Sequence, residues 1–212
     1  MNTDAWVDML ARGAGAAPRA VSARRLGPAA CAGLLASALL AMLILDPLPA
    51  SAFASGSTWM KLVYTGTFAV AAGWLAARAA RPVARTRQPT RAVLVLVVLM
   101  VGLGLAALLF DTAPGGRMDV LMGSTALQCP WLVLGLSLPA LGLSFWAMRG
   151  LAPTQLRIAG FAAGLLAGAV GAFGYSLACP EASVAFVAVW YTLGIALTGV
   201  LGALLGPRAL RW

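Results

Sequence analysis

The C-terminal run YSLACPEASVAFVAVWYTLGIALTGVLGALLGPRALRW, residues 175–212, opens with a cysteine that is followed by a proline and an acidic residue. A long apolar segment comes next, and the run ends with the basic residues Arg208 and Arg211. About 20 apolar residues in a helix cross the roughly 30 Å hydrocarbon core of a bilayer. The run is therefore predicted to cross a membrane once and to carry a thiol at one mouth of the span.

The rest of the chain has the same apolar character. Of its 212 residues, 61% are hydrophobic and 10% are charged, and the mean hydropathy is +0.91, which is outside the range of soluble domains. Because only helices and closed barrels satisfy their backbone hydrogen bonds in lipid, we expect an all-α integral membrane protein built as a six-transmembrane-helix bundle. The six predicted spans are residues 28–45, 60–80, 92–110, 127–148, 158–178 and 183–205.

These spans leave little chain outside the membrane. We expect a cytoplasmic N-terminal tail with a short amphipathic helix at residues 1–26, a transmembrane domain at 27–207 and a cytoplasmic C-terminal end at 208–212. The first apolar run is long and lacks a clear cleavage site, so it is not expected to be a secretory signal peptide.

The basic residues are strongly biased to one side of the predicted spans. Thirteen of the fifteen fall on the side of the two termini, and only Lys61 and Arg117 fall on the other. The positive-inside rule therefore assigns both termini to the cytoplasm. The same bias explains the net charge of +9, so we do not expect direct binding to nucleic acid. Four of the six acidic residues lie on the outer side: Asp46, Asp111, Asp119 and Glu181.

The N-terminal tail contains a short helical pattern. Trp6, Met9 and Leu10 follow an i, i+3, i+4 spacing that places them on one face, with Val7 beside them. Helices of this length are marginal in water, so we expect this helix to form against another surface. That surface is either the lipid headgroups, with Trp6 as an interfacial anchor, or a soluble partner that binds the helix.

Few groups in the chain suit catalysis or ion transport. The sequence has no histidine, and no charged residue falls in the middle of a predicted span. It also has no paired carboxylates, nucleophile elbow or phosphate-binding loop. We therefore expect that the protein is not an enzyme and requires no cofactor.

The outer cysteines are the one feature with a distinct chemistry. The topology places Cys129 and Cys179 on the same outer face, whereas Cys31 lies near the cytoplasmic side and is expected to be a small packing residue. The outer pair suits a structural disulfide, or free thiols that respond to oxidants or to soft ions such as Cd²⁺, Hg²⁺ or Cu⁺. Asp119 or Glu181 could add an oxygen ligand to such an ion. The spacing of the cysteines does not distinguish between a disulfide, redox-active thiols and a metal site.

Three interpretations compete on the residues alone. A small transporter or channel for a soft metal would need thiols or polar groups on a path inside the membrane, and the spans offer only scattered Ser and Thr. A thiol oxidoreductase would need a C-x-x-C pair, but both outer cysteines stand alone before a proline. A structural bundle stapled by a disulfide remains open.

Glycines recur at helical spacing in the last two predicted spans. Such ridges let helix backbones approach closely, either within the bundle or between protomers. The glycines are Gly160, Gly164 and Gly168 in the fifth span and Gly199, Gly202 and Gly206 in the sixth.

Several motifs, most of them in the last third of the chain, resemble the NrsF (negative regulator of sigma F) family of six-span bacterial anti-sigma factors. The first half agrees more loosely, through the short N-terminal helix, Trp59-Met60-Lys61 and Cys129-Pro130. The most specific motifs are Arg149-Gly-Leu-Ala-Pro153, Gly160-Phe-Ala-Ala-Gly164-Leu-Leu-Ala-Gly168, Cys179-Pro-Glu181, Val189-Trp190-Tyr191-Thr-Leu-Gly194 and Leu210-Arg211-Trp212.

The resemblance implies a function that composition does not. It implies an inner-membrane protein that holds an extracytoplasmic-function (ECF) sigma factor inactive and releases it when heavy-metal or oxidative stress acts on Cys129 and Cys179. The family often has a histidine before the second cysteine, where this chain has Ala178, which favours a redox role over metal ligation. The sigma-binding surface is then expected at Trp6, Val7, Met9 and Leu10. The loop at 149–157, which joins the two cysteine-bearing spans, is the expected transmission path.

Overall fold

The computed structural model of the chain describes residues 3–13, 21–81, 85–151 and 153–211. Every regular element within these ranges is helical, which confirms the predicted all-α fold. Ala152 and Trp212, which belong to two of the motifs above, lie outside the described residues.

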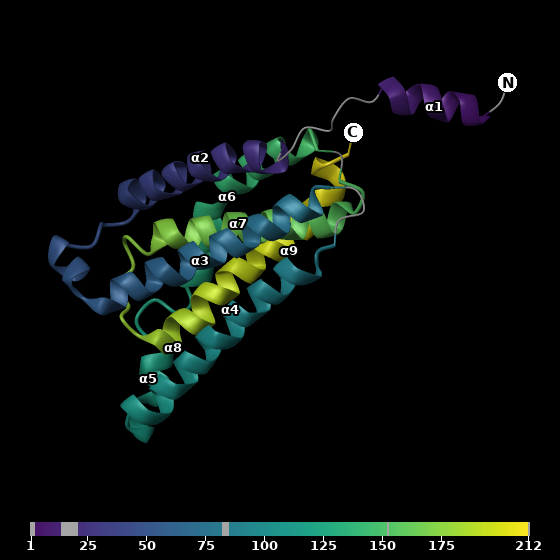
Figure 1. Ribbon diagram of the computed structural model, residues 1–212. Helices are drawn as coiled ribbons and strands as arrows, with labels where there is room; N and C mark the ends of the chain where they lie inside the picture. The colour runs from purple at the N-terminus through teal and green to yellow at the C-terminus, as the bar shows by residue number, and fades with distance from the viewer. Residues whose placement is uncertain (1–2, 14–20, 82–84, 152, 212) are drawn as a thin grey trace.

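Six long helices make up the bundle (Figure 1). They are α2 (Val21–Ile44), α3 (Gly56–Ala79), α4 (Arg87–Ala106), α6 (Cys129–Arg149), α7 (Leu156–Tyr175) and α9 (Thr192–Ala209). The shorter α-helices are α1 (Thr3–Gly13), α5 (Arg117–Met122) and α8 (Val184–Phe186). The remaining elements are the 3₁₀ helices η1 (Ala50–Ala54) and η3 (Pro114–Gly116) and the π-helical turns η2 (Ala107–Asp111) and η4 (Val187–Tyr191).

Five helical segments in the described chain are long and apolar enough to cross a membrane. They run over residues 21–44, 87–111, 129–149, 156–175 and 184–209, and they correspond to five of the six predicted spans. The other predicted span is α3, a helix of 24 residues that is not among the five. Lys61 and Arg78, near its two ends, lower its hydropathy.

Helix α7 occupies the centre of the bundle. Fifteen of its 20 residues are buried, and it packs against α2, α3, α6 and α9. Small residues fill most of its length, so four neighbours can surround it at close range. The outer helices instead expose large apolar side chains, such as Leu43 at 81% and Val98 at 69%, which suits a surface in contact with lipid.

The glycine ridges of α7 and α9 face each other within the chain. A Cβ added at Gly164 would lie 2.8 Å from the Cα of Gly199, and one added at Gly160 would collide with the carbonyl oxygen of Gly202. The neighbour that the glycine ridges left open in the sequence is thus the other ridge, in the same chain. No side chain larger than hydrogen fits at these contacts without moving a backbone.

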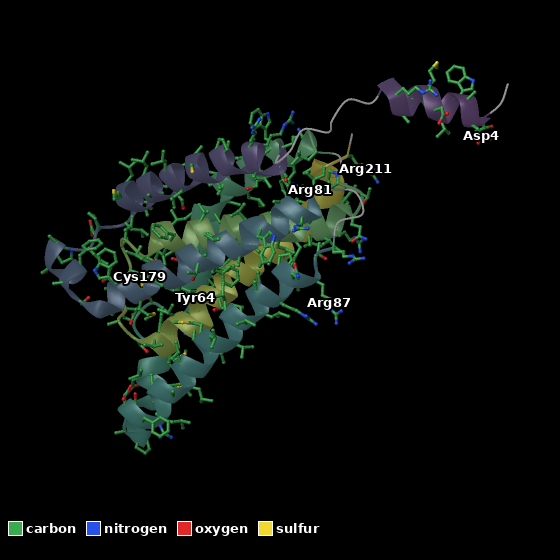
Figure 2. The ribbon with its side chains drawn as sticks, in the orientation of Figure 1. Asp4, Tyr64, Arg81, Arg87, Cys179 and Arg211 are labelled. Atoms are coloured by element: carbon green, nitrogen blue, oxygen red, sulfur yellow. The ribbon has the colours of Figure 1, made fainter. Side chains whose placement is uncertain are left out.

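The bundle has two chemically different ends. Figure 2 shows Cys179 at one end and Arg81, Arg87 and Arg211 at the other. The helices run alternately between these ends, so the loop after α2, the loop before α6 and the loop after α7 meet at the cysteine end (Figure 1). The arginine-rich loops gather at the opposite end, as the charge pattern predicts.

Candidate functional site

Cys129 and Cys179 are both fully buried, each with an exposed fraction of 0%, and both are free thiols. Cys129 is the first residue of α6, and its backbone N–H donates to the carbonyl of Thr125 at 2.9 Å. Cys179 follows the last turn of α7, and its N–H donates to the carbonyl of Tyr175 at 3.0 Å. The two residues lie at the same end of the bundle, where hydrogen bonds between Glu181 and Ser124 join the loop after α7 to the loop before α6.

Two tyrosines surround the thiol pair. Tyr175 lies close to both Cys129 and Cys179. The Tyr191 ring stacks at an angle on Tyr175, with ring centroids 5.6 Å apart. The Tyr191 hydroxyl is buried beside Cys179 and Ser176, but it forms no well-aligned hydrogen bond within the described chain. Tyr191 lies in the π-helical turn η4, and such turns are common at functional sites.

Lys61 lies directly beside the thiols. Its side chain is 1% exposed, and its Nζ donates to the backbone carbonyls of Cys179 at 2.7 Å and of Glu181 at 2.9 Å. A buried ammonium is costly unless polar partners replace its water. The two carbonyls of the loop after α7 provide that replacement, and they bring α3 into the site.

Glu181 joins the loops that carry the two cysteines. Its carboxylate accepts hydrogen bonds from the backbone N–H and the hydroxyl of Ser124, and a longer one from the Thr125 hydroxyl at 3.4 Å. Gly123 has a φ of +53°, and a Cβ there would lie 2.6 Å from a carboxylate oxygen of Glu181. The absence of a side chain at Gly123 therefore lets the carboxylate reach the backbone of the loop before α6.

The carboxylates are poorly placed to complete a metal site. Within the described residues, no three cysteine, aspartate or glutamate side chains gather as a group that could hold an ion. The Glu181 oxygen that was expected as an extra ligand is engaged by Ser124, and Asp119 is exposed on α5.

A cavity of about 360 Å³ opens beside the thiol pair. It reaches Tyr175 and Thr125, which are both neighbours of the cysteines, and the loop after α2 forms its other wall. The backbone N–H of Leu48 in that loop donates to the carbonyl of Leu177 at 3.0 Å. The cavity is lined by Gln128, Ala178 and Pro180, which are the sequence neighbours of the two cysteines, and not by the cysteines themselves.

The predicted N-terminal helix is present as α1, and it has no buried residue. Its predicted binding residues Trp6, Val7, Met9 and Leu10 are exposed by 46%, 59%, 57% and 66%. Asp8 and Arg12 form a 3.7 Å ion pair one turn apart on the same helix. The four apolar side chains thus form an uncovered surface on α1.

Side-chain contacts also organise the arginine end. Arg81 follows α3 and donates to the hydroxyl of Ser22, at 3.3 Å from Nε and 3.2 Å from Nη2. Arg149 donates from Nε to the carbonyl of Ala209 at 2.6 Å, which ties the end of α6 to the end of α9. Cys31, which was expected to be a small packing residue, is exposed on α2, where it lines an apolar groove.

The family model for NrsF, described as "Negative regulator of sigma F", matches residues 10–212 of this chain. The chain belongs to the NrsF family. It is 36% identical over 214 residues to a protein of Azospira oryzae named "Probable anti-sigma-F factor NrsF", and 35% identical over 215 residues to one of Caulobacter vibrioides named "Anti-sigma-F factor NrsF". Both alignments cover all of both chains, and the family description is that of a regulator rather than of a catalyst. No solved structure matches the chain.

Sequence reasoning missed several residues of this NrsF site. Lys61 was counted as an outer basic residue and quoted in the Trp59-Met60-Lys61 motif, but its burial was not expected. Tyr191 was quoted only as part of a motif. Nothing in the sequence indicated that Ser124 binds Glu181, because 56 residues separate them in the chain.

Proposed function

We propose that this NrsF family member is an inner-membrane anti-sigma factor that sequesters an ECF sigma factor and releases it when heavy-metal or oxidative stress acts on Cys129 and Cys179. The observation that carries the proposal is the match to the family over residues 10–212, together with the match to two proteins named as anti-sigma-F factors over the full length of the chain. A full-length match includes both the tail and the bundle, and the proposed mechanism requires both.

The proposed topology has six spans with both termini in the cytoplasm. Helix α3 is the additional span, because it has the same 24-residue length as α2 and packs along the central helix α7. With α3 in the membrane, every loop that carries several arginines lies on one side, as the positive-inside rule requires. The thiol pair then faces the periplasm, where oxidants and metal ions arrive first.

The proposed stimulus acts on the two buried thiols. An oxidant would take two electrons from the pair, which would form one S–S bond and release two protons. A soft divalent ion would instead replace the two thiol protons and bind to both sulfurs. Both reactions fix the distance between the sulfur at the start of α6 and the sulfur in the loop after α7, so both would constrain the outer ends of these helices.

The proposed binding surface for the sigma factor is the apolar face of α1. Trp6, Val7, Met9 and Leu10 are exposed, and amphipathic helices of this kind commonly dock in apolar grooves of partner proteins. The arginines at the same end are proposed to act mainly as topology determinants in contact with anionic lipid.

Co-purification tests this proposal. The full-length wild-type protein is solubilised in mild detergent from its own bacterial host, with and without CdCl₂ or diamide, and bound proteins are identified by mass spectrometry. The variants are Cys129→Ser/Cys179→Ser and, as a matched control, Cys31→Ser. We expect the wild-type and Cys31→Ser proteins to release a sigma factor on treatment, and the double variant to retain it.

Two other results would contradict parts of the proposal. A sigma factor that stays bound to the wild-type protein in all conditions would remove the sensing role of the cysteines. No sigma factor in any sample would remove the anti-sigma role, and it would favour a small transporter for a soft metal or a bundle held by a disulfide.

A further inference from the structure

Lys61 is a buried charge for which the proposed function has no role. At 1% exposure, its ammonium group has lost nearly all contact with solvent. An apolar side chain of similar size would fill the same space without this desolvation cost, and such replacements are often neutral or stabilising. Packing alone therefore does not account for a lysine at this position.

Both acceptors of the Lys61 ammonium belong to the loop that carries a sensor thiol. One is the carbonyl of Cys179 itself, and the other is the carbonyl of Glu181, two residues later. Any displacement of the Cys179 backbone changes the geometry of the first hydrogen bond directly. The carboxylate of Glu181 also binds Ser124 in the loop before Cys129, so both cysteine loops connect to α3 through this lysine.

The opposite end of the same helix reaches the base of the N-terminal tail. Arg81, two residues after α3, donates to the hydroxyl of Ser22, which is 2% exposed and is the second residue of α2. Figure 2 shows Arg81 and Cys179 at opposite ends of the bundle. Helix α3 thus contacts the thiol loop at one end and the first turn of α2 at the other.

We propose that Lys61 is the positioning residue that ties α3 to the Cys179 loop, and that α3 carries the state of the thiol pair to the base of the N-terminal tail. This inference rests on the proposed function, because it assumes that the thiols control binding of a sigma factor. It names a route different from the loop at 149–157, which joins α6 to α7. Removing the ammonium of Lys61 would break its two hydrogen bonds to the Cys179 loop but would leave the apolar packing of α3 on α7 in place.

Hydrogen bonds from Lys61 are needed because apolar packing alone would allow the Cys179 loop to move without moving α3. The contacts between α3 and α7 are largely between small and apolar side chains, which have little directional preference. Hydrogen bonds from a charged donor are directional and stronger than those between neutral groups. As long as the Lys61 ammonium is hydrogen-bonded to the carbonyls of Cys179 and Glu181, a displacement of the Cys179 loop therefore also displaces α3.

The test measures a coupling ratio, which is the dissociation constant of the sigma factor after thiol treatment divided by that in the reduced protein. The ligand is the sigma factor co-purified with the wild-type protein, and the treatments are CdCl₂ and diamide on the full chain in nanodiscs. The variants are Lys61→Met, which keeps an unbranched side chain without charge, and Lys61→Arg, which keeps the charge. Thr65→Val is the matched control, because the Thr65 hydroxyl is buried one turn along α3 and bonds only to carbonyls of its own helix.

We expect a wild-type ratio of at least about fivefold, a typical size for coupling between two sites. The ratio should fall to about 1 in Lys61→Met, whereas Thr65→Val should keep the wild-type ratio and Lys61→Arg most of it. The thiols of Lys61→Met should still react, as measured by the loss of maleimide-reactive cysteines. Ser22→Ala, a mild change at the other end of α3, should also lower the ratio, and it provides the test if Lys61→Met does not fold.

The outcomes separate this inference from the proposed function. A wild-type ratio of 1 would contradict the proposed function itself. A wild-type ratio above fivefold that is unchanged in Lys61→Met would overturn the role of Lys61. An unchanged ratio in Ser22→Ala would overturn the route through α3.

Discussion

The carboxylate of Glu181 accepts two hydrogen bonds from Ser124, one from the backbone amide at 2.7 Å and one from the hydroxyl at 2.6 Å. This pair connects the loop after α7, which contains Cys179, to the loop before α6, which leads directly into Cys129 at the start of that helix. The two thiols are therefore held near each other by a polar contact outside the helices.

Replacing Glu181 by alanine should loosen the thiol site. The change removes the acceptor of both Ser124 hydrogen bonds, which we expect to lower the free energy of unfolding by about 1–2 kcal/mol because the site is partly exposed. The measurement is the thermal unfolding midpoint of the purified protein in detergent. Asp119→Ala is the matched control, because this carboxylate is exposed at the same end of the bundle, and it should leave the midpoint unchanged. Equal midpoints for the two variants would contradict the structural role of Glu181.

Gly123→Ala should lower the stability of the protein for two reasons. Gly123 has a φ of +53° with a ψ of −160°, a conformation that is almost restricted to glycine, and the new Cβ would meet the Glu181 carboxylate. We expect a loss of about 1–3 kcal/mol in unfolding free energy. Gly115→Ala is the control, because a Cβ there would meet no atom within 4 Å. The thermal unfolding midpoints of the two variants are compared. A smaller decrease for Gly123→Ala than for Gly115→Ala would contradict the strain at Gly123.

Gly164→Val should force α7 and α9 apart. The new side chain would meet the backbone of Thr198 and Gly199, which cannot move as a flexible side chain can. Overpacking of this kind costs about 1–3 kcal/mol and sometimes more. Gly135→Val on α6 adds the same side chain where the glycine faces open space, and we expect it to have little effect. The measurements are the yield of monodisperse protein and its thermal unfolding midpoint. If Gly164→Val leaves both unchanged, α7 and α9 are not in close contact at this position.

Trp6→Ala and Leu10→Ala should weaken binding of the sigma factor. Large apolar side chains in the centre of an interface commonly contribute at least 2 kcal/mol, so each change should raise the dissociation constant by about 30-fold. Asp8→Asn, on the opposite face of the same helix, should leave binding unchanged. Titration of the solubilised protein with the purified sigma factor measures the constants. If Asp8→Asn is as harmful as Trp6→Ala, the apolar face is not the binding surface.

Cysteine labelling tests whether α3 spans the membrane. Ser51 and Arg85 are exposed on either side of α3 and can each be replaced by a single cysteine in a chain that lacks the native ones. In intact spheroplasts, a membrane-impermeant maleimide should label Ser51→Cys, whereas Arg85→Cys should react only after lysis. Labelling of both positions in intact cells would show that α3 does not cross the bilayer and would remove the sixth span.

Much of the architecture could be predicted because membrane helices need long apolar runs. The runs located the long helices, and the bias of the arginines separated the two ends of the bundle. The spacing of Trp6, Met9 and Leu10 also predicted α1. These signals are local in the sequence or depend only on the number of basic residues on each side of the predicted spans. They therefore do not require knowledge of which helices are neighbours.

The contacts within the site could not be predicted in the same way. In lipid, the apolar periodicity of a helix does not distinguish the face that meets protein from the face that meets acyl chains. The burial of Lys61 depends on α3 lying beside the end of α7, and the position of Tyr191 depends on a π-helical turn. Lateral order of this kind results from steric fit between helices, which a single sequence does not reveal.

The contact between α7 and α9 limits how the chain can change over evolutionary time. At Gly160, Gly164 and Gly202 the neighbouring backbone already occupies the place of a Cβ, so most single-nucleotide changes at these codons would produce a protein that folds poorly. The exposed apolar residues of α2 and α4 meet no such limit and can be exchanged for one another. We therefore expect substitutions to accumulate slowly in α7 and α9 and quickly on the lipid-facing helices. For an engineer, the outer helices are the places to insert labels or to improve expression, and the central pair is best left untouched.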